Sequence, residues 1–367
     1  MPSAVIVGAG VFGASLARQL ARSRWDVTLV ERVSPGHVRA GSGGESRLIR
    51  CGHGDDEWHA LSARRALELW REIDPAVVVE AGVVWLAHRE DGWEAASERV
   101  LRALGIPCER VDPADLFPSV AVDDLAFALL EPEAGALRAR EATRRLAEQA
   151  VAAGAVLELV EARPEGAAVR LADGRVLAGD RVVWACGGWL PGLFPEAGLD
   201  LRITQQDVFF FGAEAAWRTP GVPAWVDYDG AAYGLGDLDG RGVKVSPDVE
   251  GPPFDPETGS RVALGEHERL AREYLARRFP ALAQAPLVGT RTCQYELTGD
   301  TKFVCAPHPA HDGRVWLLGG GSGHGFKHGP ALAERAEAWL GGDEPPEPRF
   351  ALGPRTADRG LRTAGGR

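Results

Sequence analysis

The first part of the chain alternates apolar and polar stretches in the order that a β–α–β unit requires. Residues 4–7 form a short apolar run of the kind that makes a buried parallel strand. Leu16, Ala17 and Leu20 then fall on one face of a predicted helix, and a second apolar run at 27–30 predicts the neighbouring strand. The pattern therefore predicts two parallel strands joined by a helix at the start of the chain.

Three glycines stand between the first strand and the helix. Gly8, Gly10 and Gly13 have GxGxxG spacing: the first permits a tight turn, the second lets the backbone approach a pyrophosphate, and the third allows close helix packing. The amides and dipole of the helix N-terminus then face the phosphates. Glu31 ends the second strand, where a carboxylate accepts from a ribose hydroxyl. The segment predicts a dinucleotide site; the alternative is a glycine-rich turn that holds nothing.

Further along, apolar periodicity marks more helices and strands. Residues 36–57 are polar and glycine-rich, and a loop of this length inside a domain is usually functional. The Asp-Gly pair at 173–174 lies between two short apolar runs and predicts a hairpin. Helices are predicted at 58–73, 94–104, 141–153, 266–279 and 331–340, and strands at 83–87, 156–160, 168–172, 175–177, 181–185 and 315–318.

Two stretches break this order and predict a second domain inserted into the first. Residues 107–140 alternate short apolar pieces with Pro and Asp, and residues 205–245 are rich in predicted strands with glycine turns. The predicted fold class is α/β: a Rossmann-type nucleotide domain with an inserted, mainly antiparallel β-sheet substrate domain. The predicted boundaries are 1–82, 141–203 and 296–355 for the first domain, 83–140 and 204–295 for the second, and a disordered tail at 356–367.

Composition narrows the class of protein. The 367 residues carry a net charge of −11 with no basic block, which argues against nucleic acid as a partner. No apolar stretch approaches the ~20 residues of a membrane span, and no signal-like segment precedes residue 4, so no membrane association is expected. The five cysteines form no CxxC pair, which favours a reducing, cytoplasmic setting. A monomer or small homo-oligomer acting on a small molecule is expected.

Five segments far apart in the sequence carry more specific patterns. They are the fingerprint at 4–31, GSGGESRLIR at 41–50, YGLGDLDGRGVK at 233–244, RTCQYE at 291–296 and SGHGFKHG at 322–329. Together they resemble the FAD-dependent amine oxidases of the D-amino-acid oxidase superfamily, within it the monomeric sarcosine oxidase and N-methyltryptophan oxidase group. The resemblance implies FAD contacts at Gly8, Gly10, Val11, Phe12, Gly13, Glu31, Arg32, Ser42, Arg47, Val160, Cys293, Gly321, Gly323, Gly325, Phe326 and Lys327.

The same resemblance implies roles for a cysteine and three cations. Cys293 matches a cysteine that forms a thioether to the flavin 8-methyl carbon; the alternative is a small buried hydrophobe. Arg50 and Lys327 match the pair that holds the substrate carboxylate, an arginine fork beside a point charge. Arg47 matches an arginine beside the flavin. Both Arg50 and Lys327 could instead be ordinary solvated side chains.

Further residues match the substrate and oxygen side of the family's site. Lys244 matches a lysine that promotes reaction with oxygen, unless it is an outward-pointing strand lysine. Tyr233 and Tyr295 match tyrosines that line the substrate cavity, with core packing as the alternative. Asp248 stands where sarcosine oxidase has an active-site histidine, which favours a larger or cyclic amine over sarcosine. His324 is expected to position backbone, and no metal is expected because no ligand cluster accompanies it.

The resemblance implies an FAD-dependent oxidase of a carboxylate-bearing secondary amine, either an N-methyl or a cyclic imino amino acid. Hydride would pass to flavin N5, and O2 would reoxidise the flavin with release of H2O2. One alternative is a dehydrogenase that passes electrons to a carrier. The other is a non-catalytic flavin-binding subunit of a larger complex. A plain NAD dehydrogenase is disfavoured because it would not need the 291–329 block.

Overall fold

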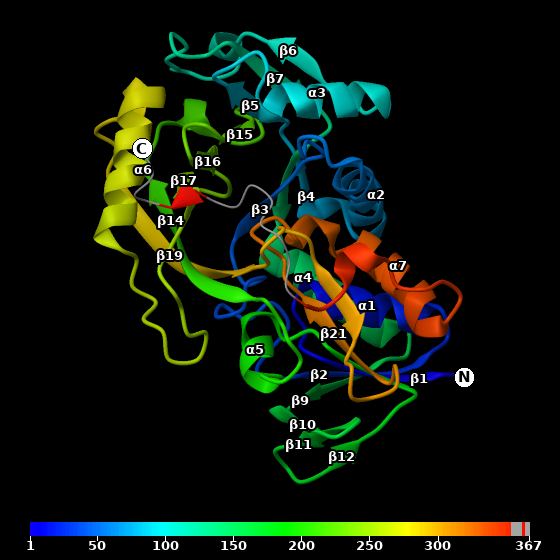
Figure 1. The fold of residues 1–367 in the computed structure, drawn as a ribbon. Helices are drawn as coiled ribbons and strands as arrows, with labels where there is room; N and C mark the ends of the chain where they lie inside the picture. Colours follow the sequence, from blue (N-terminus) through cyan, green and yellow to red (C-terminus); the bar gives the residue numbers. More distant parts are fainter. Residues whose placement is uncertain (354–361, 364–367) are drawn as a thin grey trace.

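Two large sheets organise the molecule. The computed structural model describes residues 1–353 and 362–363. In Figure 1 a six-stranded sheet and its helices form the lower body, and a second, eight-stranded sheet with helices α3 and α6 forms the upper body. This arrangement confirms the predicted α/β class with an added, mainly antiparallel sheet.

The six-stranded sheet has the order β20-β21-β13-β1-β2-β9 and is parallel except for the edge strand β20. Helices α1 (Val11–Arg22), α4 (Ala139–Ala152) and α7 (Gly329–Gly341) pack side by side, with α1 in contact with both others. Their small and aliphatic residues bury one continuous core with the sheet. The strands are β1 (Ser3–Val7), β2 (Asp26–Glu31), β9 (Val156–Leu159), β13 (Arg181–Trp184), β20 (Val304–Pro307) and β21 (Val315–Gly319).

The eight-stranded sheet has the order β19-β14-β17-β16-β15-β5-β7-β6, and only the β15–β5 pair is parallel. Helix α6 (Gly265–Arg278) covers strands β14 and β17, while α3 (Trp93–Ala103) packs on β5. The strands are β5 (Val83–Ala87), β6 (Glu109–Val111), β7 (Phe127–Glu131), β14 (Arg202–Phe211), β15 (Ala224–Asp227), β16 (Ala232–Leu235), β17 (Val243–Pro247) and β19 (Leu287–Leu297).

Strands β14 and β19 connect the two bodies. They pair antiparallel from Arg202↔Leu297 to Phe211↔Leu287, and in Figure 1 they run from the upper sheet down to the lower body. Strand β19 brings the RTCQYE motif to the nucleotide sheet. Sequence periodicity did not indicate β19, because its site-facing half is polar rather than apolar.

Three small sheets complete the fold. Strands β3 (Ser46–Ile49), β8 (Gly135–Arg138) and β4 (Val78–Glu80) form one, and the hairpin predicted at Asp173-Gly174 joins β11 (Ala168–Leu171) to β12 (Val176–Leu177) beside β10 (Ala162–Glu165). Strand β18 (Val249–Glu250) pairs with β22 (Arg362–Thr363). Apart from β22, the tail predicted at 356–367 lies outside the described residues. The domain boundaries stay a prediction.

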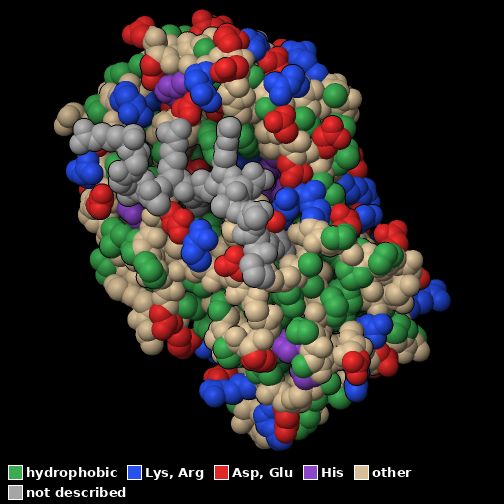
Figure 2. All heavy atoms as spheres, in the orientation of Figure 1, with side chains coloured by type: hydrophobic (Ala, Val, Ile, Leu, Met, Phe, Trp, Pro, Cys, Tyr) green, Lys and Arg blue, Asp and Glu red, His purple; other side chains and the backbone are tan. Residues whose placement is uncertain are grey.

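The helices predicted from periodicity are confirmed with small shifts at their ends. Helix α2 runs over Glu57–Ile73, with Asp56 as its N-cap accepting from the His59 N–H. In the described part of the chain no helix is long and apolar enough to span a membrane. Figure 2 shows acidic and basic side chains intermixed over the visible face.

Candidate active site

The glycine turn after β1 is shaped by contacts that no side chain would allow. Gly8 has φ +101°, and a Cβ on it would lie 2.5 Å from the Ala185 carbonyl oxygen. A Cβ on Gly13 would lie 1.9 Å from the Gly8 oxygen, so α1 starts in direct contact with the turn. A Cβ on Gly10 would meet only Ser42 Oγ at 3.4 Å, so this backbone stays open for a ligand. Gly8 and Gly13 therefore have the turn and helix-packing roles predicted for them, and the pyrophosphate contact at Gly10 stays a prediction.

A cavity of about 830 Å³ opens beside this turn. The volume is in the range of small-molecule and cofactor sites. The carboxyl ends of β1 and β2, the 41–42 segment, strand β19 and the loop after β21 all contribute to its wall. Of the predicted FAD contacts, the cavity is lined by Gly8, Gly10, Val11, Phe12, Glu31, Arg32, Ser42, Arg47, Val160, Cys293, Gly321, Gly323, Gly325 and Phe326. Gly13 and Lys327 do not line it.

Glu31 is oriented by the backbone around it. Its Oε2 accepts from the Ala9 N–H at 2.9 Å and its Oε1 from the Val33 N–H at 3.0 Å. Each carboxylate oxygen keeps a second acceptor site. Glu31 therefore keeps acceptor capacity at the end of β2, and its contact with a ribose hydroxyl stays a prediction.

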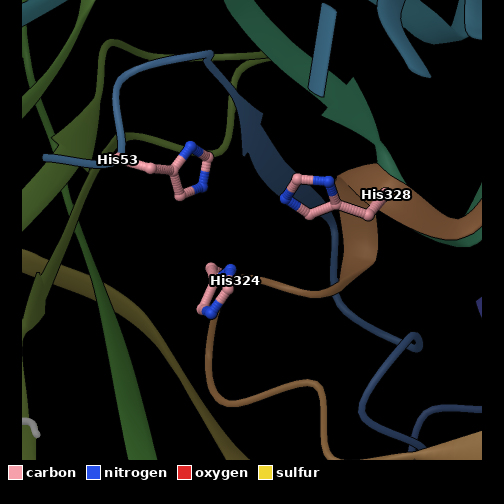
Figure 3. Close-up of side chains that lie close together, drawn as sticks. All are labelled: His53, His324 and His328. Atoms are coloured by element: carbon pink, nitrogen blue, oxygen red, sulfur yellow. The ribbon is translucent and has the colours of Figure 1, made fainter. Parts of the chain in front are cut away.

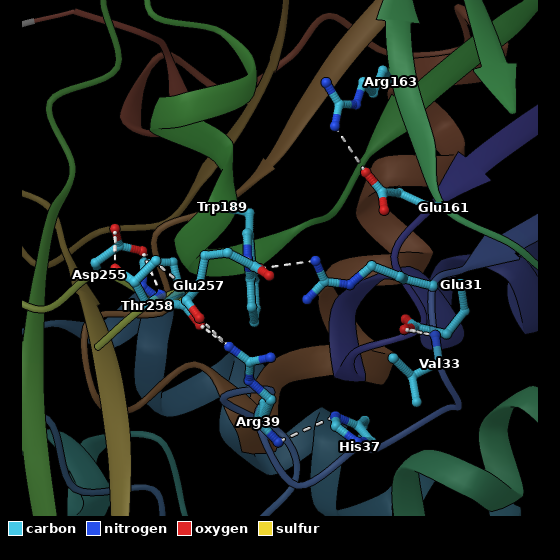
Figure 4. Close-up of polar contacts among 12 residues, drawn as sticks. Glu31, Val33, His37, Arg39, Glu161, Arg163, Trp189, Asp255, Glu257 and Thr258 are labelled. Atoms are coloured by element: carbon cyan, nitrogen blue, oxygen red, sulfur yellow. Dashed lines mark hydrogen bonds and ion pairs between the residues drawn. The ribbon is translucent and has the colours of Figure 1, made fainter. Parts of the chain in front are cut away.

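The outer rim of the cavity joins three segments far apart in the chain (Figure 4). The Arg32 guanidinium forms a 2.8 Å ion pair with Glu257 and lies 5.5 Å over the Trp189 ring, while the Trp189 Nε1–H donates to Glu257 at 3.0 Å. Arg39 donates to the Pro256 carbonyl at 3.3 Å and to that of Glu257. Sequence reasoning found only Arg32 here, because the other residues come from segments with no motif.

The residues present fit a dinucleotide. The turn offers open backbone at Gly10, and the first N–H of α1, that of Val11, is held by Ser42 Oγ at 2.9 Å. The next amides of the helix have no acceptor within the helix, which makes the end of α1 attractive to phosphate oxygens. Glu31 lies at the carboxyl end of β2, where a ribose contact is expected. The wall therefore matches the chemistry of FAD from pyrophosphate to ribose.

Cys293 lies in the cavity wall on strand β19. Its side chain is buried, and its Sγ is 3.4 Å from Nη2 of Arg47. Arg47 is held in turn by the carbonyls of Gly41 at 2.6 Å and Ser46 at 2.8 Å. The Cys293 thiol on β19 and the Arg47 guanidinium on β3 thus both line this cavity.

Four cations come from the segments around this cavity, and of these only Arg47 is among its lining residues in the described chain. Lys244 and Lys327 are buried, and Arg47 and Arg50 are partly buried. Lys244 Nζ donates to the backbone oxygen and hydroxyl of Ser46 at 3.1 and 3.3 Å, and Lys327 Nζ donates to the His324 carbonyl at 3.1 Å. Within residues 1–353, none of the four has a carboxylate within ion-pair distance. Buried cations are normally paired with anions. Here the acidic groups act from beyond ion-pair distance: Glu131 and Asp248 on Arg50, and Glu45 on Lys244.

Burial acts on both lysines. Burial, and then the nearby Arg47, lower the pKa of Lys244 to about 7. Burial, and then the nearby Arg50, hold the pKa of Lys327 well below its ordinary value. A negatively charged ligand in this region would raise both pKa values by favouring the charged forms.

Arg50 is fixed by aromatic and acidic residues that the sequence did not indicate. Its guanidinium lies 4.5 Å over the Trp85 ring and donates to the Gly52 carbonyl. Buried Glu131 accepts from the Trp85 Nε1–H at 2.7 Å and from the Cys51 N–H at 2.6 Å, which pins the same segment. Because Trp85 and Glu131 come from the distant strands β5 and β7, only the sheet brings them to Arg50.

The two predicted tyrosines meet directly. Tyr233 OH and Tyr295 OH are 3.2 Å apart, and Tyr295 lines the cavity. Asp248 follows β17, and burial raises its pKa to about 6 against the opposing effect of Arg50. The structure therefore brings Tyr233, Tyr295, Asp248 and Arg50 into one electrostatic neighbourhood.

His324 differs from its prediction. No ligand cluster was expected around it, but one ring nitrogen of each of His53, His324 and His328 lies within 4.8 Å of the others. The expectation was wrong because His53 comes from a distant segment, and only the fold brings it to His324 and His328, which are four residues apart in one loop.

Comparisons with known proteins agree with this geometry. Residues 3–339 match the family described as FAD dependent oxidoreductase. The chain is 28% identical to the monomeric sarcosine oxidase of Streptomyces avermitilis, covering 90% of this chain and 91% of that one. It is 26% identical to the N-methyl-L-tryptophan oxidase of Citrobacter koseri, covering 93% and 95%.

A solved structure supports the fold. The L-proline dehydrogenase from P. horikoshii superposes with a TM-score of 0.84 over 95% of this chain and 96% of that chain. At 20% sequence identity, this similarity supports the fold alone.

Proposed function

The chain belongs to the FAD dependent oxidoreductase family, and from this premise we propose that it oxidises a carboxylate-bearing secondary amine, an N-methyl or cyclic imino amino acid, with O2 as the electron acceptor. Its relatives include enzymes that are named for oxidation of sarcosine and N-methyl-L-tryptophan. The observation that carries the proposal is the group formed by Arg47, Arg50, Lys244 and Lys327, which has no carboxylate partner in the described chain.

Arg50 and Lys327 bind the substrate carboxylate in this proposal. Arg50 presents a planar fork that suits two carboxylate oxygens, and its stacking on Trp85 fixes the plane of that fork. Lys327 adds a point charge that is buried and has only a backbone acceptor. An anionic group bound between them would supply the missing counter-charge.

Bound FAD would accept the hydride equivalent from the carbon next to the amine and pass the electrons on to O2, giving H2O2. In this proposal Lys244, which is close enough to Arg47 for that charge to lower its pKa, promotes the transfer of electrons to O2. It is buried and faces Ser46, so the alternative of an outward-pointing strand lysine does not apply. A charge at ~4 Å in an effective dielectric of about 20 stabilises developing negative charge by about 4 kcal/mol.

Cys293 is the proposed covalent anchor of the cofactor. The thiol lies in the cavity wall, 3.4 Å from the Arg47 guanidinium, on the side where a bound flavin would be in reach. Acid precipitation tests this role: the yellow colour stays with the pellet if the flavin is covalently attached. Colour in the supernatant removes this role for Cys293 but leaves the rest of the proposal in place.

Asp248 and the tyrosine pair define the amine side. A carboxylate whose pKa is raised to about 6 is ionised at neutral pH and attracts a cationic amine. Tyr233 and Tyr295 present two phenol groups to the same side. This set favours an amine larger than sarcosine, because a histidine in the related enzyme is replaced by a shorter acid.

A substrate panel tests the proposal. The purified yellow protein is supplied with sarcosine, N-methyltryptophan, proline and pipecolate under air, and peroxide is measured beside anaerobic reduction of an artificial dye. Peroxide with at least one of these amines supports the oxidase. Dye reduction without peroxide would identify a dehydrogenase, and neither signal would point to a flavin-binding subunit that does not turn over by itself.

A further inference from the structure

Four histidines from three segments of the chain pack against one another. His53 follows β3, His59 lies on α2, and His324 and His328 flank the 3₁₀ turn before α7. The centroid of the His53 ring lies 5.2 Å from that of His59, 5.6 Å from His324 and 5.4 Å from His328. In Figure 3 the rings of His53, His324 and His328 surround a common space.

Two of the rings are held from behind by backbone carbonyls. His53 Nδ1 lies 2.9 Å from the Cys51 oxygen, and His324 Nε2 lies 2.9 Å from the Thr301 oxygen. A carbonyl oxygen can only accept, so these two ring nitrogens carry the hydrogen. In a neutral imidazole the opposite nitrogen then carries a lone pair.

The other two rings are held by side chains. His59 Nδ1 lies 2.9 Å from Asp56 Oδ2, which likewise places the lone pair of that ring on Nε2. His328 Nδ1 lies 2.9 Å from the Ser62 hydroxyl. Metal-bound histidines are oriented in this way, by an acceptor behind the ring that fixes its tautomer.

The inner nitrogens of all four rings lack partners. His53 Nε2, His59 Nε2, His324 Nδ1 and His328 Nε2 are buried, and none has a hydrogen-bond partner in the part of the chain that the structure describes. A buried polar atom left without a partner costs about 1–3 kcal/mol. Several lone pairs that share one space and have no donor require a cation or a water molecule there.

We propose that His53, His324 and His328 bind a divalent metal ion of the Zn²⁺ type. One nitrogen of each lies within 4.8 Å of the others. Ligands at about 2.0–2.1 Å in a tetrahedral Zn²⁺ site lie roughly 3.3 Å apart, so each ring must move inward by less than about 1 Å. Water, or His59, whose ring centroid is 5.2 Å from that of His53, supplies the fourth ligand.

The chemistry of the donors selects the metal. Imidazole nitrogens suit Zn²⁺ and its first-row neighbours, whereas Mg²⁺ and Ca²⁺ require oxygen ligands. His53 and His324 each hold a hydrogen on the outer nitrogen and leave the inner nitrogen without a partner among the described residues, which is the form in which imidazole binds such an ion.

A bound ion would join the two segments that carry the proposed substrate cations. His53 is three residues from Arg50, and His324 and His328 flank Lys327, whose Nζ donates to the His324 carbonyl at 3.1 Å. The ion would therefore fix these loops against α2. The metal site itself stands independently of the proposed function.

Metal content tests the inference directly. The full-length flavin-loaded protein is treated with a chelator, titrated with Zn²⁺, freed of excess metal and measured by mass spectrometry. The expected result is one Zn²⁺ per chain and a melting temperature several degrees higher, since binding to the native state alone adds stability of about 2.7 kcal/mol at 100 times Kd. X-ray absorption should show three or four nitrogen or oxygen ligands at about 2.0–2.1 Å.

Variants assign the ion to this cluster. His53→Ala and His324→Ala remove partly exposed ligands and should each lower the Zn²⁺ content at least tenfold, while His311→Ala, a histidine outside the cluster, should retain it. Flavin absorbance and circular dichroism confirm that each variant is folded. No stoichiometric Zn²⁺ in the wild-type protein, retention of Zn²⁺ by both variants, or sulfur ligands at about 2.3 Å would overturn the proposal, the last by assigning the ion to cysteines.

Discussion

The outer and inner halves of the active-site cavity are built in opposite ways. At the nucleotide end, the charged side chains already have partners: Glu31 accepts from backbone N–H groups, and Arg32 pairs with Glu257. At the inner end, Lys244 and Lys327 are buried with only neutral acceptors around them. The nucleotide end thus selects its ligand by the shape of the backbone. The inner end selects an anionic ligand, because its lysines have no carboxylate within ion-pair distance in the described part of the chain.

This difference predicts that a single methyl group added to the glycine turn should have the largest effect, because it would disrupt FAD binding. In Gly13→Ala the new Cβ would lie 1.9 Å from the Gly8 oxygen, so α1 must move away from the turn. We expect loss of bound FAD and a destabilisation of about 3 kcal/mol or more. FAD content and thermal unfolding measure both effects. Gly265→Ala is the control, because its Cβ would meet nothing within 4 Å; equal FAD content in the two variants would contradict a backbone-shaped site.

At the inner end, removal of a charge should matter more than removal of volume. Lys244→Met keeps an unbranched chain in the buried site but removes the cation. The rate of oxygen reaction is expected to fall by roughly 10³, from the loss of about 4 kcal/mol. Anaerobic reduction by substrate should change little. Stopped-flow measurement of the two half-reactions separates them, and an unchanged oxygen rate would leave Lys244 without its proposed role.

The same lysine gives a pH dependence with a definite sign. Because burial lowers the pKa of Lys244 to about 7, the ammonium form is present below pH 7 and is lost as the pH rises through that value. The oxygen reaction should therefore slow with rising pH in the wild-type protein and stay flat in Lys244→Met. A wild-type rate that increases over this interval would exclude the ammonium as the group that helps.

Lys327→Met tests the carboxylate clamp. Removal of one partner of a buried charge pair costs about 3 kcal/mol of binding free energy. The value of kcat/KM should therefore fall by roughly 10². Lys302→Met is the matched control at a partly exposed lysine paired with Asp300. Steady-state peroxide assays measure both variants, and a fall of equal size in the control would show that the effect is not specific to the clamp.

The smallest effect is expected at Asp248. Its folded pKa of about 6 exceeds the ordinary value, so the stability associated with its protonated form is present at low pH and is lost as the pH rises through about 6. Asp248→Asn should therefore melt about 2–4 °C above the wild-type protein at pH 8 and near it at pH 4. Asp91→Asn, an exposed control, should show no such gap. A difference in melting temperature that stays constant with pH would contradict the claim that Asp248 is buried and titrates near pH 6.

The two halves also differed in how far the sequence predicted them. The nucleotide end depends on a contiguous β–α–β unit whose spacing is visible in the sequence, and its strands, helix and glycines are confirmed. Arg50 and Lys327 were found only through motifs shared with a family. Trp85 and Glu131, which fix Arg50, were missed because strand pairing between β5 and β7 brings them there.

The strand β19 and the histidine cluster were missed for related reasons. Residues 287–297 lack apolar alternation because several of their side chains face a polar site rather than a core. His53 and His59 lie far from His324 and His328 in the sequence, so the four-residue spacing of the last two did not by itself indicate the cluster. Long-range packing, rather than local propensity, determines both features.

The unmatched positive charge at the inner end is the central claim, and a comparison of two substrates tests it most directly. The kcat/KM for peroxide formation is measured with an active secondary amino acid and with the same amine lacking its carboxylate. Loss of a carboxylate that binds both Arg50 and Lys327 should lower kcat/KM by roughly 10³ or more, since hydrogen bonds to charged groups contribute about 1.5–3 kcal/mol each. Equal values for the two amines would contradict the account.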